Sequence, residues 1–262
     1  MCGISGIINF DIEDTVKPSD LEQMLDQVNH RGPDKTGYFY EKNIGFGHKR
    51  LSIIDINHGN QPMYNSSKNI VLIFNGEIYN FREIRSQCES LGYIFATQSD
   101  TEVIIAAYEL FGFSCLNKFN GMFAFVIYDK TKNLFFFARD RLGKKPLYFF
   151  KSKTKLLFSS EIKSIINFPN FKKLLNKKAI YDYFMFQYIP DQTSIFKDIK
   201  QIPPGHYMVL KNDTTEYVRY WNLSNHVSNI YSFDEYKDEL RHLISDATKI
   251  RMISDVPYGV FL

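Results

Sequence analysis

The chain of 262 residues carries 32 Lys and Arg against 29 Asp and Glu, for a net charge of +3, and 44% of its residues are hydrophobic. Because the two signs of charge are interspersed and nearly balanced, we expect no nucleic acid and no membrane as a partner. No stretch approaches the ~18 uninterrupted apolar residues of a membrane-spanning helix, and the first residues lack the basic region and apolar core of a signal peptide.

Three cysteines, Cys2, Cys88 and Cys115, give an odd count without the spacing of metal ligands. Such a set is typical of a reducing compartment, so we expect a cytoplasmic location and no bound metal. Cys88 lies on the apolar side of a helical pattern with Ile84 and Leu91, and Cys115 lies in a short apolar segment. Both are therefore expected in the core.

The chain begins with a cysteine directly after the initiator methionine. Removal of Met1 would leave Cys2 with both a thiol and a free α-amine, whose pKa of about 7.7–8.0 keeps part of it unprotonated near neutrality. An N-terminal amine of this kind can activate a nucleophile for amide chemistry. Gly3 and Gly6 would let other backbone approach the thiol. The alternative is an ordinary small residue at a frayed terminus.

The first half of the chain alternates strand and helix patterns. Residues 2–10 form an apolar run typical of a buried strand, and Ser19 with Glu22 predicts a helix that starts with a capping box. A polar loop at 30–34 follows, which Pro33 keeps out of the helix. Further strands are expected at 36–41, 44–54 and 69–74, and further helices at Asn80, with Glu83 as its capping partner, and at Asp100.

The second half is richer in hairpin patterns. Residues 122–129 and 134–140 predict a hairpin. The loop 139–145 is basic but lacks a phosphate-cradling glycine pattern, so we expect a solvated connection or a domain-interface loop. Further elements are expected as strands at 147–150 and 156–159, a helix at 176–187, and a hairpin of 206–210 with 216–220.

The character of the chain changes in its last part. Residues 222–231 are polar and typical of a linker, and Ser232 with Glu235 predicts a long capped amphipathic helix. Residues 256–262 have the pattern of a short strand. A helix and one strand cannot make a core of their own. Two units are therefore expected: a complete domain at 1–220, and a linker with the start of a second domain at 221–262.

If the thiol of Cys2 attacks a carboxamide, hydrogen-bond donors must stabilise the oxyanion that develops. The loss of one such donor typically slows a reaction on the order of 10²–10³-fold. Asn75 and Gly76 follow a predicted buried strand and offer a side-chain amide and an unobstructed backbone N–H. The alternative is a plain turn, since Asn-Gly is the commonest hairpin dipeptide.

The amide of an amino acid would bring an α-carboxylate and an α-ammonium group. Arg50 offers the two-pronged donor that suits a carboxylate, which a lysine cannot match. Glu77 and Asp100 are the candidate partners of the ammonium. The alternatives are a charge at the end of a strand for Glu77 and a helix N-cap for Asp100. This set of residues requires no metal.

Six segments, each weak alone, together carry a specific resemblance. They occur in the order 1–4, 30–34, 47–55, 75–80, 99–102 and 138–141. Through them, residues 1–220 resemble the glutaminase half of glutamine-hydrolysing asparagine synthetases, which are class II glutamine amidotransferases.

This resemblance implies an α+β fold of the N-terminal-nucleophile hydrolase type, with two stacked antiparallel sheets between helical layers. It implies Cys2 as the nucleophile, and Asn75 with the Gly76 N–H as the oxyanion hole. Arg50 would hold the glutamine carboxylate, and the two carboxylates named above would hold its amine. The backbone around four further residues would line the same pocket: Leu51, Ser52, Ile53 and Ile54.

The tail carries a second resemblance. Residues 254–262 look like the lead-in to the pyrophosphate-binding loop of the synthetase half, with Leu262 at the edge of the ATP site. The resemblance thus implies hydrolysis of L-glutamine to glutamate and ammonia, without a cofactor. The ammonia would supply a domain that uses ATP and magnesium to convert aspartate to asparagine, and a homodimer is compatible with this arrangement.

Two alternative functions stay open. The same glutaminase could serve the amidation of a cell-surface sugar or of another carboxylate, because the residues that discriminate these acceptors would lie beyond Leu262. A glutamine-binding regulatory module without turnover is the second alternative, although binding alone requires neither Cys2 nor Asn75.

Overall fold

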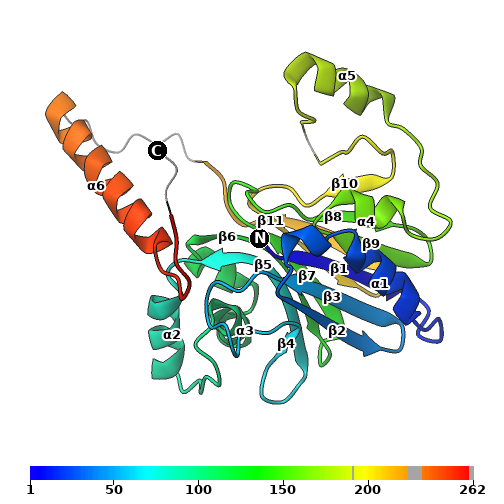
Figure 1. Ribbon diagram of the computed structural model, residues 1–262, viewed down its shortest axis with the longest axis horizontal. Coiled ribbons are helices and arrows are strands. Elements are labelled where there is room, and N and C mark those ends of the chain that lie inside the picture. The colour runs from blue at the N-terminus through cyan, green and yellow to red at the C-terminus, as the bar shows by residue number, and fades with distance from the viewer. Residues whose placement is uncertain (191, 224–231, 260–262) are drawn as a thin grey trace.

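The computed structural model describes residues 1–190, 192–223 and 232–259. Within them, two antiparallel sheets of six strands each face one another, and helices cover the outer face of both (Figure 1). This confirms the predicted α+β architecture of two stacked sheets between helical layers. Most of the predicted linker at 222–231, and Leu262, lie outside the described residues.

The strands follow one another across each sheet in a fixed order. In the first sheet the order is β10 (Ile199–Gln201), β8 (Tyr148–Lys151), β9 (Lys155–Ser159), β1 (Gly3–Asn9), β3 (Ile44–Arg50) and β2 (Lys35–Glu41). In the second sheet it is β12 (Thr214–Arg219), β11 (His206–Lys211), β7 (Leu134–Arg139), β6 (Gly121–Asp129), β5 (Ile70–Ile78) and β4 (Met63–Tyr64). Both predicted hairpins are confirmed.

The space between the sheets is filled by side chains from alternate strand positions. Ile4 and Ile8 of β1 meet Phe46 of β3, and Val71 and Ile73 of β5 face them from the second sheet. Because side chains alternate between the two faces of a strand, Cys2, Arg50 and Asn75 share the inward alternation of these three strands, with His48 between Phe46 and Arg50. Strand alternation therefore brings three of the predicted site residues to one end of the inter-sheet space.

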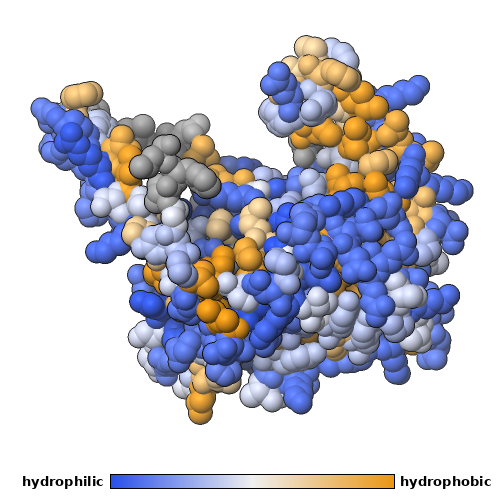
Figure 2. Space-filling view, in the orientation of Figure 1, coloured by the Kyte–Doolittle hydropathy of each residue, from blue (hydrophilic) through white to orange (hydrophobic). Residues whose placement is uncertain are grey.

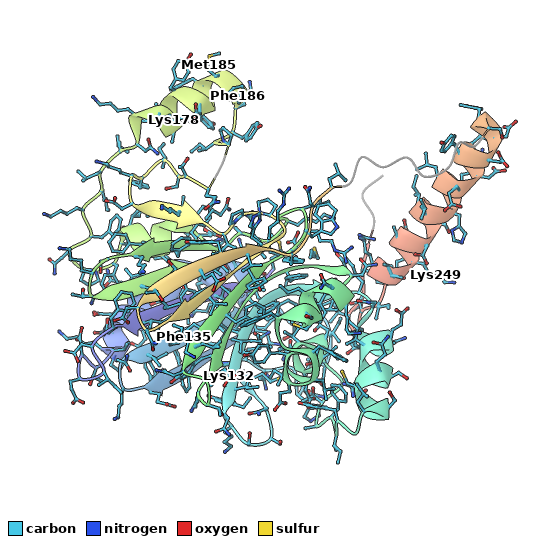
Figure 3. All side chains as sticks on the ribbon, turned by 180° about the vertical axis from the view of Figure 1, so that it is seen from behind. Lys132, Phe135, Lys178, Met185, Phe186 and Lys249 are labelled. Atoms are coloured by element: carbon cyan, nitrogen blue, oxygen red, sulfur yellow. The ribbon has the colours of Figure 1, made fainter. Side chains whose placement is uncertain are left out.

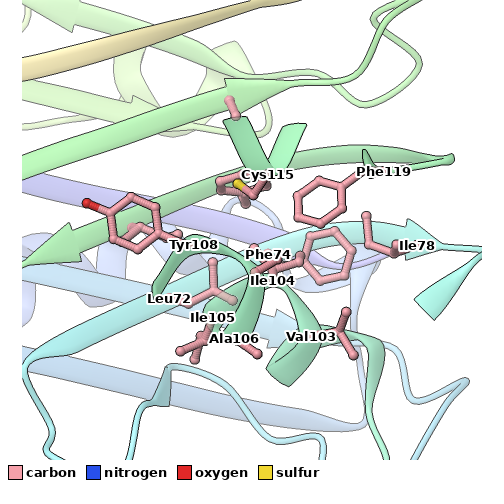
Figure 4. Close-up of a cluster of buried hydrophobic side chains, with 14 of the residues drawn as sticks. Leu72, Phe74, Ile78, Val103, Ile104, Ile105, Ala106, Tyr108, Cys115 and Phe119 are labelled. Carbon is pink, nitrogen blue, oxygen red and sulfur yellow. The ribbon is translucent and has the colours of Figure 1, made fainter. Parts of the chain in front are cut away.

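Helices α2 (Phe81–Ser90) and α3 (Asp100–Phe111) cover the outer face of the second sheet, together with the 3-10 segment η2 (Gly112–Lys118). Leu72 and Phe74 of β5 pack against Ile104 and Tyr108 of α3 (Figure 4). Two of the cysteines lie in this cluster, fully buried, as predicted: Cys88 and Cys115.

Helices α1 (Pro18–Asp26) and α4 (Ile162–Ile166) cover the first sheet, and the short 3-10 segment η1 (Asn29–Arg31) follows α1. The predicted capping box of Ser19 and Glu22 is wrong. The helix begins at Pro18, the residue type favoured at a first helical position, so Ser19 lies inside the helix and Lys17 is the N-cap without a side-chain bond.

Two other predicted strand ends and one predicted capping bond differ from the structure. Strand β3 ends at Arg50 instead of residue 54, because residues beyond it form a loop bonded to the Arg50 side chain. Strand β5 continues to Ile78, with Asn75 paired to Ala124, so the turn alternative for Asn75 and Gly76 is wrong. Asn80 precedes α2, but its side chain bonds the backbone of residues 118 and 120 instead of capping the helix.

Two helices stand away from the sheets. On α5 (Lys177–Phe186), exposed hydrophobic side chains gather at one end of the molecule (Figure 2), and Figure 3 shows Met185 and Phe186 among them. Helix α6 (Phe233–Arg251) has the predicted capping box at Ser232, and none of its residues is buried. None of the described helices is both long and apolar enough to span a membrane.

The strand predicted at 256–262 is wrong for the part that the structure describes, residues 256–259, which are irregular. The chain just before them does not join a sheet. Instead, the Asp255 N–H donates to the carbonyl of Ile53, 2.9 Å away, in the loop after β3.

Candidate active site

One pocket opens at the end of the inter-sheet space where β1 begins and β3 ends. Of the residues predicted for the glutamine pocket, Ser52 does not line it; its N–H donates to the Asp34 carboxylate at 2.8 Å. The others all line the pocket: Cys2, Arg50, Leu51, Ile53, Ile54, Asn75, Gly76, Glu77 and Asp100. Residues up to 98 positions apart in the chain are thus brought together.

The thiol of Cys2 sits against the backbone of the loop after β3. Its Sγ lies 3.4 Å from the N–H and 3.7 Å from the carbonyl oxygen of Leu51. The Cys2 carbonyl accepts a hydrogen bond of 2.9 Å from Arg31 Nε, and the same guanidinium forms an ion pair with Glu161 at 3.0 Å. Burial raises the pKa of the Cys2 thiol, so the sulfur needs a base to become a thiolate.

The N-terminal amine is the candidate base for this thiol. In the chain that still carries Met1, burial lowers the pKa of the Met1 amine below the ordinary value, and the nearby cations Lys145 and Arg31 lower it further. The Met1 side chain lines the pocket, and its sulfur accepts a contact of 2.9 Å from Lys145 Nζ. An amine attached to Cys2 instead would lie next to the sulfur that it must deprotonate.

The amide of Asn75, which lines the same pocket as the thiol, is fully buried. Within the described structure, neither its Nδ2 nor its Oδ1 has a hydrogen-bond partner. A buried polar group without a partner costs about 1–3 kcal/mol, so it is rare unless a ligand or water completes it. The Asn75 side chain therefore offers an unused donor inside the pocket.

The neighbouring Gly76 is required by close packing. A Cβ at this position would come within 2.1 Å of the Met122 carbonyl oxygen and 2.7 Å of Phe123 Cα on β6. Only glycine fits between these backbone atoms without moving β5. The sequence predicts an unobstructed backbone N–H at Gly76. In the structure, the close spacing of β5 and β6 also requires glycine at this position.

Arg50 reaches into the pocket, but its guanidinium already has partners. Nη1 donates to Ile56 O at 2.9 Å and to Asn60 Oδ1 at 3.0 Å, and Nη2 donates to Ile54 O at 3.0 Å and Asp55 O at 2.6 Å. The fork predicted to meet a substrate carboxylate thus organises the loop 51–60 in this structure. A carboxylate would have to replace some of these oxygens.

Replacement of Arg50 by lysine is expected to raise the KM for glutamine at least about tenfold, with a smaller change in kcat. A single ammonium can reproduce neither the fork nor the four loop contacts, and one hydrogen bond to a charged group contributes about 1.5–3 kcal/mol. Steady-state kinetics of Arg50→Lys measures this. The matched control is Lys49→Arg on the other face of β3, which should keep the wild-type KM; an unchanged KM in Arg50→Lys would contradict the prediction.

Two carboxylates, Glu77 and Asp100, line the pocket. Asp100 Oδ2 accepts a hydrogen bond of 3.0 Å from the Ile78 N–H, and the actual N-cap of α3 is Ser99, so the N-cap alternative for Asp100 is wrong. Burial, together with the negative charge of Glu77, raises the pKa of Asp100 to about 7. The hydrogen bond from the Ile78 N–H lowers this pKa but does not outweigh burial. Burial also raises the pKa of Glu77. Because burial disfavours the charged form of both carboxylates, a cationic ligand would stabilise them strongly.

Glutamine affinity is expected to fall as the pH is lowered through the pKa of free Asp100. Protonated Asp100 cannot pair with an ammonium, and a bound ammonium lowers its pKa, so linkage predicts binding about tenfold weaker at about pH 6 than at about pH 8. Calorimetric titration of the Cys2→Ala protein, which cannot turn glutamine over, measures this. The double variant with Asp100→Asn should bind weakly at both pH values; a pH dependence that survives in it would contradict the assignment.

The sequence analysis missed several lining residues, among them Lys145, Gln61 and Thr101. The basic loop that contains Lys145 had been expected to be solvated or to form a domain interface. Instead, Lys145 is 4% exposed, and the buried guanidinium of Arg139 donates to its carbonyl oxygen at 2.8 Å. The preceding loop folds back because Arg139 also binds the carbonyls of Gly143 and Ile202. The local sequence, with one glycine among five charged residues at 139–145, carries no signal for that arrangement.

Comparison with known proteins adds a family and a fold. The model of the glutamine amidotransferase domain matches residues 1–221. Asparagine synthetase [glutamine-hydrolyzing] 1 of Bacillus subtilis (strain 168) is 36% identical over 266 residues, which cover 100% of this chain and 42% of the relative. Amidase chry2 of Gibberella zeae is 34% identical over 280 residues, which cover 100% of this chain and 41% of the relative.

A solved structure supports the fold. The glutamine phosphoribosylpyrophosphate amidotransferase from B. subtilis, complexed with ADP and GMP, superimposes with a TM-score of 0.63 at 19% identity. The match covers 84% of this chain and 49% of that chain. The chain spans less than half the length of the two curated relatives described above.

Proposed function

Since this chain belongs to the glutamine amidotransferase domain family, we propose that it hydrolyses L-glutamine to glutamate and ammonia at the pocket of Cys2. The thiol would give its proton to the α-amine of a processed Cys2 and attack the side-chain amide carbon of glutamine. The carbonyl oxygen would become an oxyanion, and Asn75 Nδ2 and the Gly76 N–H would donate to it. Collapse would break the carbon–nitrogen bond and transfer the proton from the ammonium to the leaving nitrogen, which departs as ammonia.

The second half of the reaction would release the acyl group. Water would attack the γ-glutamyl thioester of Cys2 while the same amine accepts the water proton. A second oxyanion would form at the same donors; its collapse would break the carbon–sulfur bond, and the ammonium would return its proton to the departing thiolate. Glutamate and the free thiol result, so that glutamine and water are converted to glutamate and ammonia without any other reactant.

The substrate's α-groups would lie at the other end of the pocket. Arg50 would exchange loop oxygens for the α-carboxylate, and Glu77 and Asp100 would pair with the α-ammonium. Backbone of Leu51, Ile53 and Ile54 would line this part of the pocket. Ser52 would support the wall from outside, through its bond to Asp34.

The unpartnered amide of Asn75 carries this proposal. It is fully buried, it lines the same pocket as the Cys2 thiol, and no described residue bonds either of its polar atoms. A protein that only packs or only binds an amino acid at this place has no need of such a donor. A reaction that develops negative charge beside the thiol does.

Measurement of glutamate released from L-glutamine tests the proposal. We expect equal amounts of glutamate and ammonia, and no release from D-glutamine, which cannot place its α-groups on the same partners. Binding of L-glutamine without any release would contradict the hydrolytic function and leave the regulatory module as the better reading.

The wider role follows from the longer relatives and is also a proposal. Ammonia from residues 1–220 would supply a second unit that starts within 221–262 and converts aspartate to asparagine with ATP and magnesium, in the cytoplasm. Leu262 would lie at the edge of its ATP site, and the protein would form a homodimer. The alternative is another acceptor, a sugar or a different carboxylate; incubation of the longer protein with glutamine, ATP and each acceptor would separate them.

Removal of Met1 is expected in every active preparation. Only then does the α-amine belong to Cys2, and only then does the methionine side chain leave the pocket that it lines. Intact-mass measurement would show a chain that begins with Cys2. A fully active preparation that retains Met1 would contradict the assignment of the amine as the base.

A further inference from the structure

We propose that Asp255 is a positioning residue for the glutamine pocket, which couples the end of helix α6 to the loop that holds the Cys2 thiol. The inference rests on the proposed function for its catalytic consequence, but Asp255 itself is not among the residues assigned to the reaction. It concerns the segment 251–256, which the sequence analysis had assigned only to the start of a second unit.

Asp255 forms two hydrogen bonds to the residues on either side of Ile54, which lines the pocket. Its N–H donates to the Ile53 carbonyl at 2.9 Å, and its Oδ2 accepts from the Asp55 N–H at 2.7 Å. Between these two points lies Ile54, which lines the pocket together with Ile53. Asp255 thus donates to Ile53 through its backbone and accepts from Asp55 through its side chain, although it lies 200 positions from Asp55 in the chain.

Asp55 forms several of the hydrogen bonds that hold the loop 51–60 in place. Its φ of 48° places a non-glycine residue in the left-handed region, which surrounding contacts must hold. Its carbonyl accepts from Arg50 Nη2 at 2.6 Å, and its carboxylate accepts from the N–H groups of Gln98 at 2.8 Å and His58 at 3.0 Å. The bond to Asp255 is the one that ties this residue to the C-terminal segment.

Asp55 is connected to the reacting sulfur through the Arg50 side chain and the residue that follows Arg50. Arg50 holds the carbonyls of residues 54–56 and belongs to the end of β3, and the next residue, Leu51, contacts Cys2 Sγ through both its N–H and its carbonyl. A change in the position of Asp255 therefore acts on the wall of the substrate pocket first and on the thiol second.

The other end of the connection is anchored on α6. Ile253 packs against the hydrophobic cluster under α3, and the Arg251 guanidinium lies 4.6 Å from the ring centre of Tyr79, just after β5. The Ser254 hydroxyl bonds both the N–H and the carbonyl of Val256, at 3.1 and 2.9 Å, which fixes the turn around Asp255. The end of helix α6 and residues 253–255 thus contact both the second sheet and the loop that lines the glutamine pocket.

Loss of the Asp255 side chain is expected to raise the KM for glutamine roughly 2- to 30-fold, the range of coupling through a positioning contact, with kcat changed less. The experiment compares Asp255→Ala with Asp255→Asn, which keeps an oxygen that can accept from the Asp55 N–H. Asp255→Asn should restore most of the wild-type KM. The matched control is Asp246→Ala, which removes the same charge from the exposed surface of α6 and should have the wild-type KM.

Amide hydrogen exchange of Asp55 gives a readout that does not depend on turnover. In Asp255→Ala this amide should exchange faster than in the wild-type and in Asp246→Ala, while amides of the β-sheet core keep their protection. If the wild-type releases glutamate but Asp255→Ala keeps its KM and its Asp55 protection, the coupling is wrong and the proposed hydrolysis stands. If the wild-type releases no glutamate, the proposed hydrolysis fails, and the exchange measurement alone still decides whether Asp255 holds the loop.

Discussion

Replacement of Cys2 by alanine is expected to abolish the release of glutamate from glutamine, with a loss on the order of 10⁶ in kcat, as for other nucleophiles removed from a catalytic set. The described contacts of its sulfur are those with Leu51, so the fold should survive the substitution. Thermal unfolding and a glutamate assay on the purified variant check both statements. The matched control is Cys88→Ala, which removes a thiol from the core beneath α3 and should keep the wild-type kcat.

The same variant separates the two activities proposed for the longer protein. Because the acceptor unit needs only ammonia, synthesis from added ammonia should continue in Cys2→Ala at the wild-type rate, whereas synthesis from glutamine should stop. A folded Cys2→Ala protein that lost both would show that the thiol is not confined to glutamine hydrolysis, and the division into two sites would be wrong.

Replacement of Asn75 by alanine is expected to lower kcat on the order of 10²–10³-fold while KM changes little. The amide donor meets the substrate oxygen mainly when negative charge develops on it, so its loss acts on the transition state rather than on binding. Steady-state kinetics with glutamine measures the two constants. A rise in KM with an unchanged kcat would remove Asn75 from the oxyanion hole.

Stability provides an independent control for this variant. Since no described residue bonds the Asn75 side chain, the substitution removes a buried polar group that has no partner. The free energy of unfolding should therefore stay the same or rise, while activity falls. A variant that lost both stability and activity would indicate that Asn75 is needed for packing.

Much of the fold was predictable from local pattern. The apolar run of β1, the hairpin of β6 and β7, and the capping box of α6 are each encoded by neighbouring residues, and the structure confirms them. The capping box predicted at Ser19 failed because Pro18 starts the helix earlier. The end of β3 was misplaced because Arg50 draws the following carbonyls into a loop, a contact that strand propensity does not contain.

The site was predictable only in part, for a similar reason. Strand alternation puts Cys2, Arg50 and Asn75 on inward positions, and the family resemblance supplied their proposed roles. Lys145 was missed because its burial depends on how Arg139 folds the preceding loop. Asp255 was missed as a neighbour of the pocket because its contacts span 200 residues and pair an irregular segment with a loop. Such contacts depend on tertiary packing and leave no local signal.

The attack of the Cys2 thiol on glutamine is tested most directly with a glutamine analogue that carries a chloroketone in place of the carboxamide. Peptide mass analysis after its reaction with the protein locates the alkylated residue. One label per chain is expected, on a peptide that begins with Cys2, and excess L-glutamine should prevent it. Labelling of Cys88 or Cys115 instead, or glutamate release that continues undiminished after Cys2 is fully alkylated, would contradict the assignment of Cys2 as the nucleophile.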